Sequence, residues 1–255
     1  MTQYTAVVLA GSRPGRDQFA EQYGTDMKAL IPIGGEPMVQ RPVRALLSSA
    51  SVREVEVCSQ SADRIEAAID RDLRLSFRSS RTTIAETILE YCDDPQTHWP
   101  LLVTTADHAL LDAATIEEFT ASAAGADLAV GVVERDVMLR RFPDAQRTWL
   151  KFRVGAYTGA NLFVLSSPAV RPAIELWRSV EQDRKKAWRV MSLLGPVTLL
   201  SVALRLVSLD EVMAQLGTRL GLSATAVKLT NPLAGVDVDK PADHELVEAI
   251  LARKA

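Results

Sequence analysis

The order of apolar and polar positions predicts alternating strands and helices through the first half of the chain. Short apolar runs predict buried strands at residues 5–10, 52–58, 73–77 and 99–105. Apolar residues at helical spacing predict helices at residues 37–50, 62–70, 84–91 and 113–124. Because helices between parallel strands cover both faces of a sheet, the pattern predicts a Rossmann-like α/β fold. It should have three layers, α/β/α, around a mostly parallel mixed sheet.

The second half of the pattern is less regular. Strands are expected at residues 127–133 and 225–229, with strand residues also between 151 and 165. Helices are expected at residues 137–141, across 170–217 and at 241–251. The sequence has no internal repeat and no linker-like segment. We therefore expect one domain over residues 1–255, with a helical insertion around 170–217.

Composition narrows the functional classes. Hydrophobic residues make up 47% of the 255 residues and charged residues 24%, which is typical of a soluble globular protein. A net charge of -3 disfavours a broad nucleic-acid surface, so no nucleic-acid partner is expected. The start of the sequence lacks a signal-peptide layout, which predicts a cytoplasmic protein.

One apolar stretch, residues 190–209, has two interpretations. It is rich in Leu and Val, but Gly195-Pro196 and Arg205 interrupt it, so two short buried helices are favoured over a membrane span. The alternative is a surface that contacts a membrane or a membrane-bound enzyme.

The first candidate site is the loop after residue 10. An apolar run ends there in the glycine-bearing, basic segment 11–16, and Lys28 follows. Such a loop can offer backbone N–H groups and cationic side chains to a polyphosphate. A solvated surface loop is the alternative, because Gly, Pro and Arg are common in loops.

Two motifs make the chain similar to a known family. Residues 9–17 resemble the nucleotidyltransferase signature L-A-G-G-x-G-x-R-M, and residues 28–38 resemble its continuation K-x-L-x-x-i-x-G-x-P-M. The chain thus resembles the MobA-like NTP transferases, whose fold is a GT-A-like variant of the Rossmann fold. Ser12 and Pro14 replace usual glycines and Asp17 replaces Met, and proline removes one N–H donor.

The resemblance implies a nucleotide site around this loop. Arg16 and Lys28 would neutralise the triphosphate and act as the catalytic cations. The remaining nucleotide contacts are expected at Leu9, Ala10, Gly11, Ser12, Arg13, Gly15, Ser79, Ser80 and Thr83.

Aspartates at two further positions are candidate Mg²⁺ ligands. Asp107 follows the strand at 99–105, and it could instead cap a helix. Because parallel strands end at one edge of the sheet, Arg16 and Asp107 should be neighbours in space. In the late motif, Asp239 matches the second metal position that the resemblance implies. Asp237 would face the same way on an extended backbone, so either could bind the metal.

The segment 151–161 is the candidate acceptor site. Its glycines allow close approach, and its polar side chains could bind an acceptor phosphate. An ordinary strand face is the alternative. The substrate-binding residues expected there are Lys151, Thr158, Gly159 and Asn161.

These features together predict a Mg²⁺-dependent nucleotidyltransferase that joins an NTP to a phosphorylated small-molecule acceptor and releases pyrophosphate. CTP with a polyol or sugar phosphate is favoured, because the stretch 190–209 would suit docking beside a membrane enzyme that consumes a CDP-alcohol. The alternatives are a molybdenum-cofactor guanylyltransferase that uses GTP, and a nucleotide-binding protein without turnover. The sequence does not indicate an oligomeric state.

Overall fold

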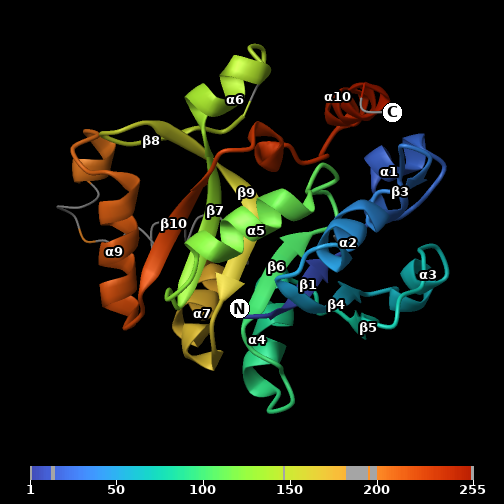
Figure 1. The fold of residues 1–255 in the computed structure, drawn as a ribbon, viewed down its shortest axis with the longest axis horizontal. Helices are drawn as coiled ribbons and strands as arrows, with labels where there is room; N and C mark the ends of the chain where they lie inside the picture. Colours follow the sequence, from blue (N-terminus) through green and yellow to red (C-terminus); the bar gives the residue numbers. More distant parts are fainter. Residues whose placement is uncertain (1, 13–14, 146, 182–194, 196–199, 254–255) are drawn as a thin grey trace.

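An eight-stranded mixed sheet forms the centre of the computed structural model, which describes residues 2–12, 15–145, 147–181, 195 and 200–253 (Figure 1). The strand order is β10-β7-β9-β6-β1-β4-β5, and β8 pairs with β9. Strand β9 is antiparallel to β6, β7 and β8, and the other pairs are parallel. The strands are β1 (Tyr4–Leu9), β4 (Val52–Ser59), β5 (Leu75–Ser79), β6 (Leu101–Thr105), β7 (Leu128–Glu134), β8 (Leu150–Lys151), β9 (Ala156–Leu165) and β10 (Ala224–Leu229). The predicted mostly parallel mixed sheet is confirmed.

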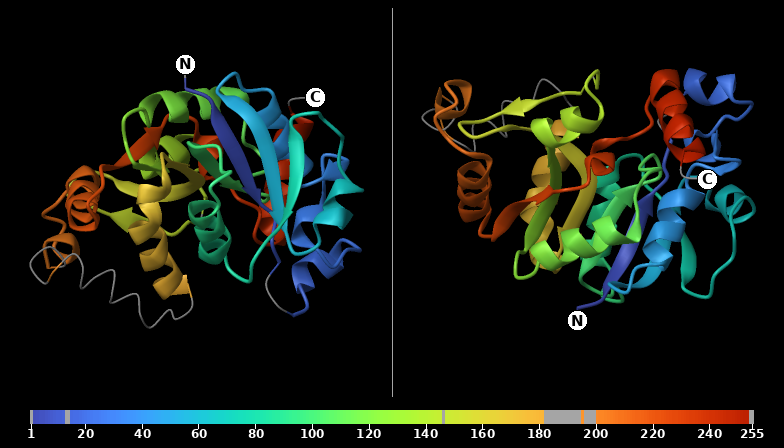
Figure 2. Two further views of the ribbon diagram at one scale, coloured as in Figure 1. Left: turned by 90° about the horizontal axis from the view of Figure 1, so that it is seen from below. Right: turned by 45° about the horizontal axis from the view of Figure 1, so that its top comes forward.

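Helices cover both faces of this sheet (Figure 2). One layer contains α2 (Gln40–Leu47) and α5 (Ala113–Ser122), and the opposite layer contains α4 (Ile84–Asp93) and α7 (Arg171–Glu181). Helix α9 (Leu209–Leu220) packs against the edge strand β10. The shorter elements are α1 (Gln18–Gln22), η1 (Lys28–Leu30), β2 (Pro32–Ile33), β3 (Glu36–Pro37), α3 (Ala62–Glu66), α6 (Arg135–Arg141), η2 (Pro168–Val170), η4 (Pro232–Gly235) and the closing α10 (Pro241–Ala252).

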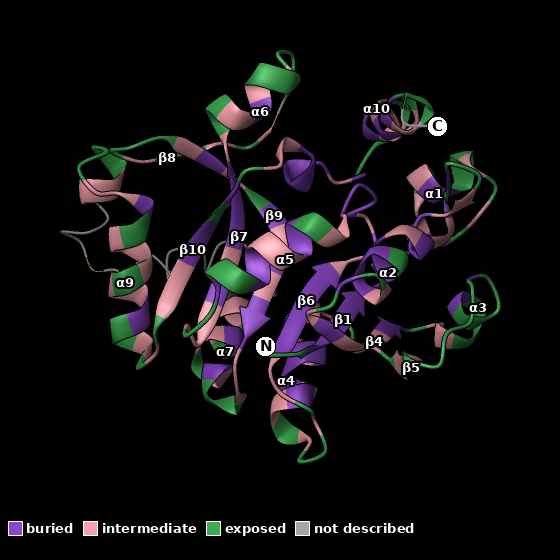
Figure 3. Ribbon diagram, viewed as in Figure 1, coloured by how far each residue is buried: buried purple, intermediate pink, exposed green. Residues whose placement is uncertain are grey.

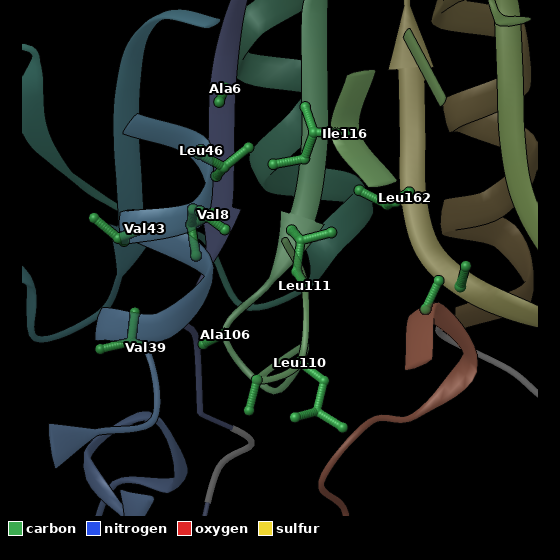
Figure 4. Close-up of a cluster of buried hydrophobic side chains, with 14 of the residues drawn as sticks. Ala6, Val8, Val39, Val43, Leu46, Ala106, Leu110, Leu111, Ile116 and Leu162 are labelled. Carbon is green, nitrogen blue, oxygen red and sulfur yellow. The ribbon is translucent and has the colours of Figure 1, made fainter. Parts of the chain in front are cut away.

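Strand β1 explains why the core has two halves. All six of its residues are buried, as expected for a central strand with a helix layer on each side (Figure 3). Ala6 and Val8 belong to the cluster that includes Leu46 and Ile116 (Figure 4), whereas Val7 belongs to the cluster on the other face. This alternation follows from the two-residue period of a strand.

The same central strand brings two loops together. Leu9 of β1 lies opposite Thr105 of β6, and Ala106 N donates to Leu9 O at 3.0 Å. The loops that follow β1 and β6 therefore leave the sheet side by side, which is the arrangement that the strand-end rule predicts.

The helix predicted at residues 37–50 is wrong at both ends. Gly34 and Gly35 have positive φ angles of 62° and 79° and form the turn of the β2–β3 hairpin, so Pro37 is a strand residue. The helix begins only at Gln40 and ends at Leu47. The helix predicted at residues 62–70 is likewise shorter and ends at Glu66.

The region 170–217 is only partly described. Helices α7 and α9 account for its two ends, and residues 182–194 and 196–199 lie outside the described residues. The expectation of two buried helices in 190–209 does not hold for Leu200, Leu204 and Leu206, which are 56–60% exposed. In the part of the chain that the structure describes, none of the helices combines the length and hydropathy required to cross a membrane.

The buried face of α5 provides a stability test. Ile116 is fully buried, so Ile116→Ala removes packed methyl groups and leaves a cavity. We expect the free energy of unfolding in urea to fall by about 2–5 kcal/mol. The exposed Ser122→Ala on the same helix is the control and should change it by less than about 0.5 kcal/mol. Equal effects of the two substitutions would contradict the packing described here.

Candidate active site

One lysine joins two carboxylates from distant parts of the chain. Lys28 Nζ donates to Asp107 Oδ2 at 2.6 Å and also to Asp239 Oδ1. Lys28 lies in η1, Asp107 follows β6, and Asp239 lies between η4 and α10. The Lys28 and Asp107 side chains are 25% and 18% exposed, whereas Asp239 is 62% exposed. The structure therefore brings together Lys28 and two of the three expected metal ligands.

Backbone contacts explain this convergence. Val238 N donates to Asp107 O at 3.1 Å, which attaches the segment after η4 to the loop after β6. Thr105 Oγ1 donates to Asp107 Oδ1 at 2.5 Å, and Asp239 N donates to Asp243 Oδ2 at 3.2 Å. Thr105 therefore orients the Asp107 carboxylate, and Asp243 holds the backbone at Asp239.

Its two carboxylate partners stabilise the charge on Lys28. Burial alone would lower the pKa of Lys28, but the charges and hydrogen bonds of Asp107 and Asp239 outweigh it and raise the pKa. The ammonium group therefore remains a cation at neutral pH.

The same two carboxylates fit a hard divalent cation. Both already contact a single cationic atom, so one ion could reach both without a backbone change. Mg²⁺ in proteins is often held by one or two carboxylates together with phosphate oxygens and water. Lys28 has to leave this position when a metal ion occupies it.

Asp237 has different partners. Its Oδ1 accepts from Arg147 Nη1, and Asn161 Nδ2 lies 3.5 Å from its Oδ2. Burial raises the pKa of Asp237, Arg147 opposes this increase, and the charges of Asp239 and Asp107 add to it. Arg147 also lies 3.7 Å from Asp243, so it links Asp237 to the first turn of α10.

Asn161 reaches this cluster because β9 is irregular. The pairing of β7 with β9 shifts register between Val130 and Val132, and Asn161 has a φ of 48°. A left-handed residue inside a strand is unusual and redirects its side chain. Strain of this kind is typical of functional positions.

The loop after β1 is attached to the end of β4. Ser12 N donates to Gln60 Oε1 at 2.9 Å, and Gln60 Nε2 donates to Arg81 O at 3.0 Å. A side chain on Gly11 would meet the Gln60 amide at 3.2 Å, so glycine permits this close approach. Leu9 and Ala10 are buried at the end of β1, and the φ of Gly15 is 107°. Arg13 and Pro14 lie outside the described residues.

Arg16 has a local partner. Its guanidinium donates to both carboxylate oxygens of Glu21, at 2.7 and 3.0 Å, and its side chain is 84% exposed. Asp17, where the family signature has Met, caps α1 by accepting from Phe19 N and Ala20 N. Among the described residues, Arg16 is therefore paired with Glu21, and no contact joins it to Asp107.

The three expected base-contacting hydroxyl residues lie around the end of β5. Ser79 is its last residue, and the buried Ser80 Oγ has no hydrogen-bond partner in the part of the chain that the structure describes. That oxygen would lie 3.5 Å from a Cβ on Gly11. Thr83 caps α4 by accepting from Glu86 N at 3.2 Å.

The other expected acceptor residues are spread along β8 and β9. Thr158 contacts η4, since a Cβ on Gly235 would lie 3.3 Å from its methyl group, and a Cβ on Gly159 would face open space. Lys151 lies in β8 and is exposed. Of these four residues, only Asn161 contacts one of the three candidate aspartates within the described part of the chain.

Two residues of this site are absent from the sequence-based predictions. Gln60 follows β4, a neighbour of β1, so the strand-end rule could have indicated it. Arg147 lies in an irregular loop without periodicity, and nothing in the pattern of the chain distinguishes it.

Comparison with known proteins identifies the family of this chain. Residues 6–197 match the model of the MobA-like NTP transferase domain. The chain belongs to this family. A solved structure described as a hypothetical transferase from Thermus thermophilus is 30% identical, with a TM-score of 0.79 over 95% of this chain and 100% of that chain.

More distant structures share the fold. The 4-diphosphocytidyl-2C-methyl-D-erythritol synthase of Anaerococcus prevotii is 10% identical, with a TM-score of 0.61 over 99% of both chains. The 2-C-methyl-D-erythritol 4-phosphate cytidylyltransferase of Thermus thermophilus is 16% identical, with a TM-score of 0.56 over 99% of this chain and 100% of that chain. No curated protein matches the sequence. This MobA-like chain therefore has the α/β nucleotidyltransferase fold.

The position of Lys28 predicts competition with metal ions. In Lys28→Met the two carboxylates lose their shared cation, so Mn²⁺ should bind the nucleotide-free protein about tenfold more tightly. Isothermal titration with Mn²⁺ measures this change. Arg16→Met, which alters a cation outside the pair of carboxylates, should leave the affinity unchanged. Unchanged or weaker Mn²⁺ binding in Lys28→Met would contradict the competition.

Proposed function

We propose that this MobA-like protein is a Mg²⁺-dependent nucleotidyltransferase that joins an NTP, with CTP favoured, to a polyol or sugar phosphate. The contact of Lys28 with both Asp107 and Asp239 carries the proposal. It supplies two carboxylates for a metal and a cation for a triphosphate at one position beside the loop after β1. A nucleotide-binding protein without turnover would not need all of these groups.

Arg16 and Lys28 neutralise the triphosphate in this reaction. Arg16 is exposed, and Glu21 is its only partner among the described residues, so a more highly charged phosphate can take its guanidinium. Lys28 has a flexible stem and can follow the phosphates once a metal ion takes its position. Ser80 Oγ, which lacks a partner among the described residues, is a candidate contact for the base.

Asp107 and Asp239 would hold Mg²⁺. When bound, the ion neutralises phosphate charge and helps to orient the reacting groups. Asp237 is the weaker candidate ligand, since Arg147 and Asn161 already engage its oxygens.

The acceptor phosphate supplies the nucleophile. One of its oxygens forms a bond to the α-phosphorus of the NTP, while the bond from that phosphorus to the bridging oxygen of the β-phosphate breaks. Pyrophosphate leaves with that bonding electron pair. The acceptor is already ionised at neutral pH, so the protein has to position and neutralise the reactants and needs no covalent intermediate.

The structural neighbours described as cytidylyltransferase and diphosphocytidyl synthase support CTP. Guanylyl transfer to the molybdenum cofactor is a second candidate, supported by the match to the MobA-like family model.

A screen of pyrophosphate release tests the proposed function. Each of the four NTPs is combined with polyol phosphates, sugar phosphates and molybdopterin in the presence of Mg²⁺. We expect release with CTP and a polyol or sugar phosphate, and none without an acceptor. Release only with GTP and molybdopterin would overturn the favoured substrates, and binding of NTP without any release would overturn the enzymatic proposal.

Paired substitutions separate the two late aspartates. Asp239→Asn should lower kcat/KM by about a hundredfold or more, because it removes a carboxylate that faces the metal. Asp237→Asn should mainly raise the KM of the acceptor, by about tenfold, since its partners are Arg147 and Asn161. Steady-state pyrophosphate release measures both, and a larger loss of kcat in Asp237→Asn would reverse the assignment.

A further inference from the structure

A hollow lies between α6 and the β8–β9 hairpin. It has a volume of about 790 Å³ and is also lined by residues 143–145 and Trp149 of the loop between these elements. Cavities of this size are typical of small-molecule sites. Its lining residues lie outside the family motifs and do not include Lys28, Asp107 or Asp239.

Cations from three separate segments line this hollow. They are Arg135 of α6, Lys151 of β8 and Arg205. None of the three forms an ion pair with any residue that the structure describes. The acidic lining residues are Asp136 and Asp144, so cations outnumber carboxylates by three to two.

Apolar walls accompany these cations. Trp149 and Phe152 line the hollow, and each also packs against a buried cluster, which fixes the position of its ring. Leu139 of α6 adds an aliphatic wall. Fixed aromatic surfaces next to exposed cationic groups suit a ligand that combines an apolar or aromatic body with an anionic group.

Two residues that line the hollow, Arg205 and Gly155, have a left-handed backbone conformation. Arg205 has a φ of 56°, a left-handed conformation that is unusual for arginine. It is held there by the bonds from Arg205 N to Val202 O at 2.9 Å and from Leu206 N to Ser201 O at 2.7 Å. Gly155 has a φ of 75°, and a Cβ there would meet Tyr157 Oη at 2.8 Å.

Two elements connect the hollow to Asp237 and its partners Arg147 and Asn161. Arg147, which pairs with Asp237, lies in the loop whose residues Ala145 and Trp149 line the hollow. Strand β9 begins at the lining residue Ala156 and continues to Asn161. Five residues of strand span roughly 15 Å. One elongated molecule could therefore reach from the hollow to Asp237.

We propose that this hollow binds the distal end of the acceptor, which therefore carries a second anionic group on an apolar or aromatic body. This inference rests on the proposed function for the identity of the ligand, but the hollow can be tested by binding alone. It narrows the acceptor class from any polyol or sugar phosphate to an elongated derivative that carries a second anionic group on an apolar or aromatic substituent.

Binding of the aromatic anion 8-anilinonaphthalene-1-sulfonate tests the hollow directly. We expect its dissociation constant, measured by fluorescence, to rise about tenfold in Lys151→Gln and in Arg205→Gln. Both side chains are exposed, so the substitutions should leave the melting temperature unchanged. Arg140→Gln, on α6 but not lining the hollow, is the matched control and should bind like the original protein.

Leu204, an exposed leucine next to Arg205 in the sequence, tests whether the probe binds outside the hollow. If Leu204→Ser abolishes binding of the fluorescent anion while Lys151→Gln does not, the probe occupies the leucine surface. That result would overturn the hollow as a binding site.

Displacement of the probe tests the acceptor class. We expect 4-carboxyphenyl phosphate to displace it at about tenfold lower concentration than glycerol 3-phosphate, and Lys151→Gln to remove this difference. Equal displacement by the two phosphates would overturn the proposed class.

Measurements of pyrophosphate release distinguish a failure of the proposed function from a failure of the proposed role of the hollow. If pyrophosphate is released with an acceptor whose KM is unchanged in Lys151→Gln, the role of the hollow is overturned and the proposed function stands. If no NTP and acceptor pair gives release, the proposed function fails, and the probe titrations still decide whether the hollow binds amphipathic anions.

Discussion

One ammonium group between two carboxylates is the interaction on which the candidate site depends. Lys28 is separated by 79 residues from Asp107 and by 211 from Asp239, yet Nζ contacts both. Two carboxylates this close repel each other, and partial burial weakens the screening of that repulsion by water. The Lys28 ammonium group offsets that repulsion. In the proposed function, a metal ion would take over this role without a rearrangement of the backbone.

The fold keeps the three groups together through contacts outside the sheet. The sheet fixes only Asp107, at the end of β6. Asp239 is held because α10 contacts the β2–β3 hairpin: His244 Nε2 lies 2.7 Å from Pro32 O, and Gly34 N donates to Glu248 Oε1 at 2.8 Å. Since this hairpin follows Lys28 directly, the closing helix also stabilises the position of the lysine. The β2–β3 hairpin and the closing helix α10 are thus packed together beside Lys28 and Asp239.

The sequence predicts the parts of the molecule that follow simple periodicities. Period-two and helical patterns identify the sheet and its layers, and the strand-end rule with the family motifs indicates Asp107 and Asp239. The hairpin at Gly34 was missed because two residues per strand are too short to produce a period. Arg147 was missed because an ion pair between an irregular loop and Asp237 depends on tertiary packing alone. Asn161 was expected among the acceptor-binding residues, but its position beside Asp237 depends on a local shift of strand register that no sequence pattern shows.

The departures from the family signature have a physical consequence for phosphate binding. Proline at position 14 removes one N–H donor from the loop after β1, and Ser12 N is already bonded to Gln60. The backbone therefore has fewer free donors for a triphosphate than a glycine-rich loop would provide. In the proposed function, the charge of the triphosphate would then be neutralised mainly by side chains, which would give Arg16 and Lys28 a larger share of the binding. Arg16 suits this role because its only described partner, Glu21, carries less charge than a triphosphate and lies on an exposed helix.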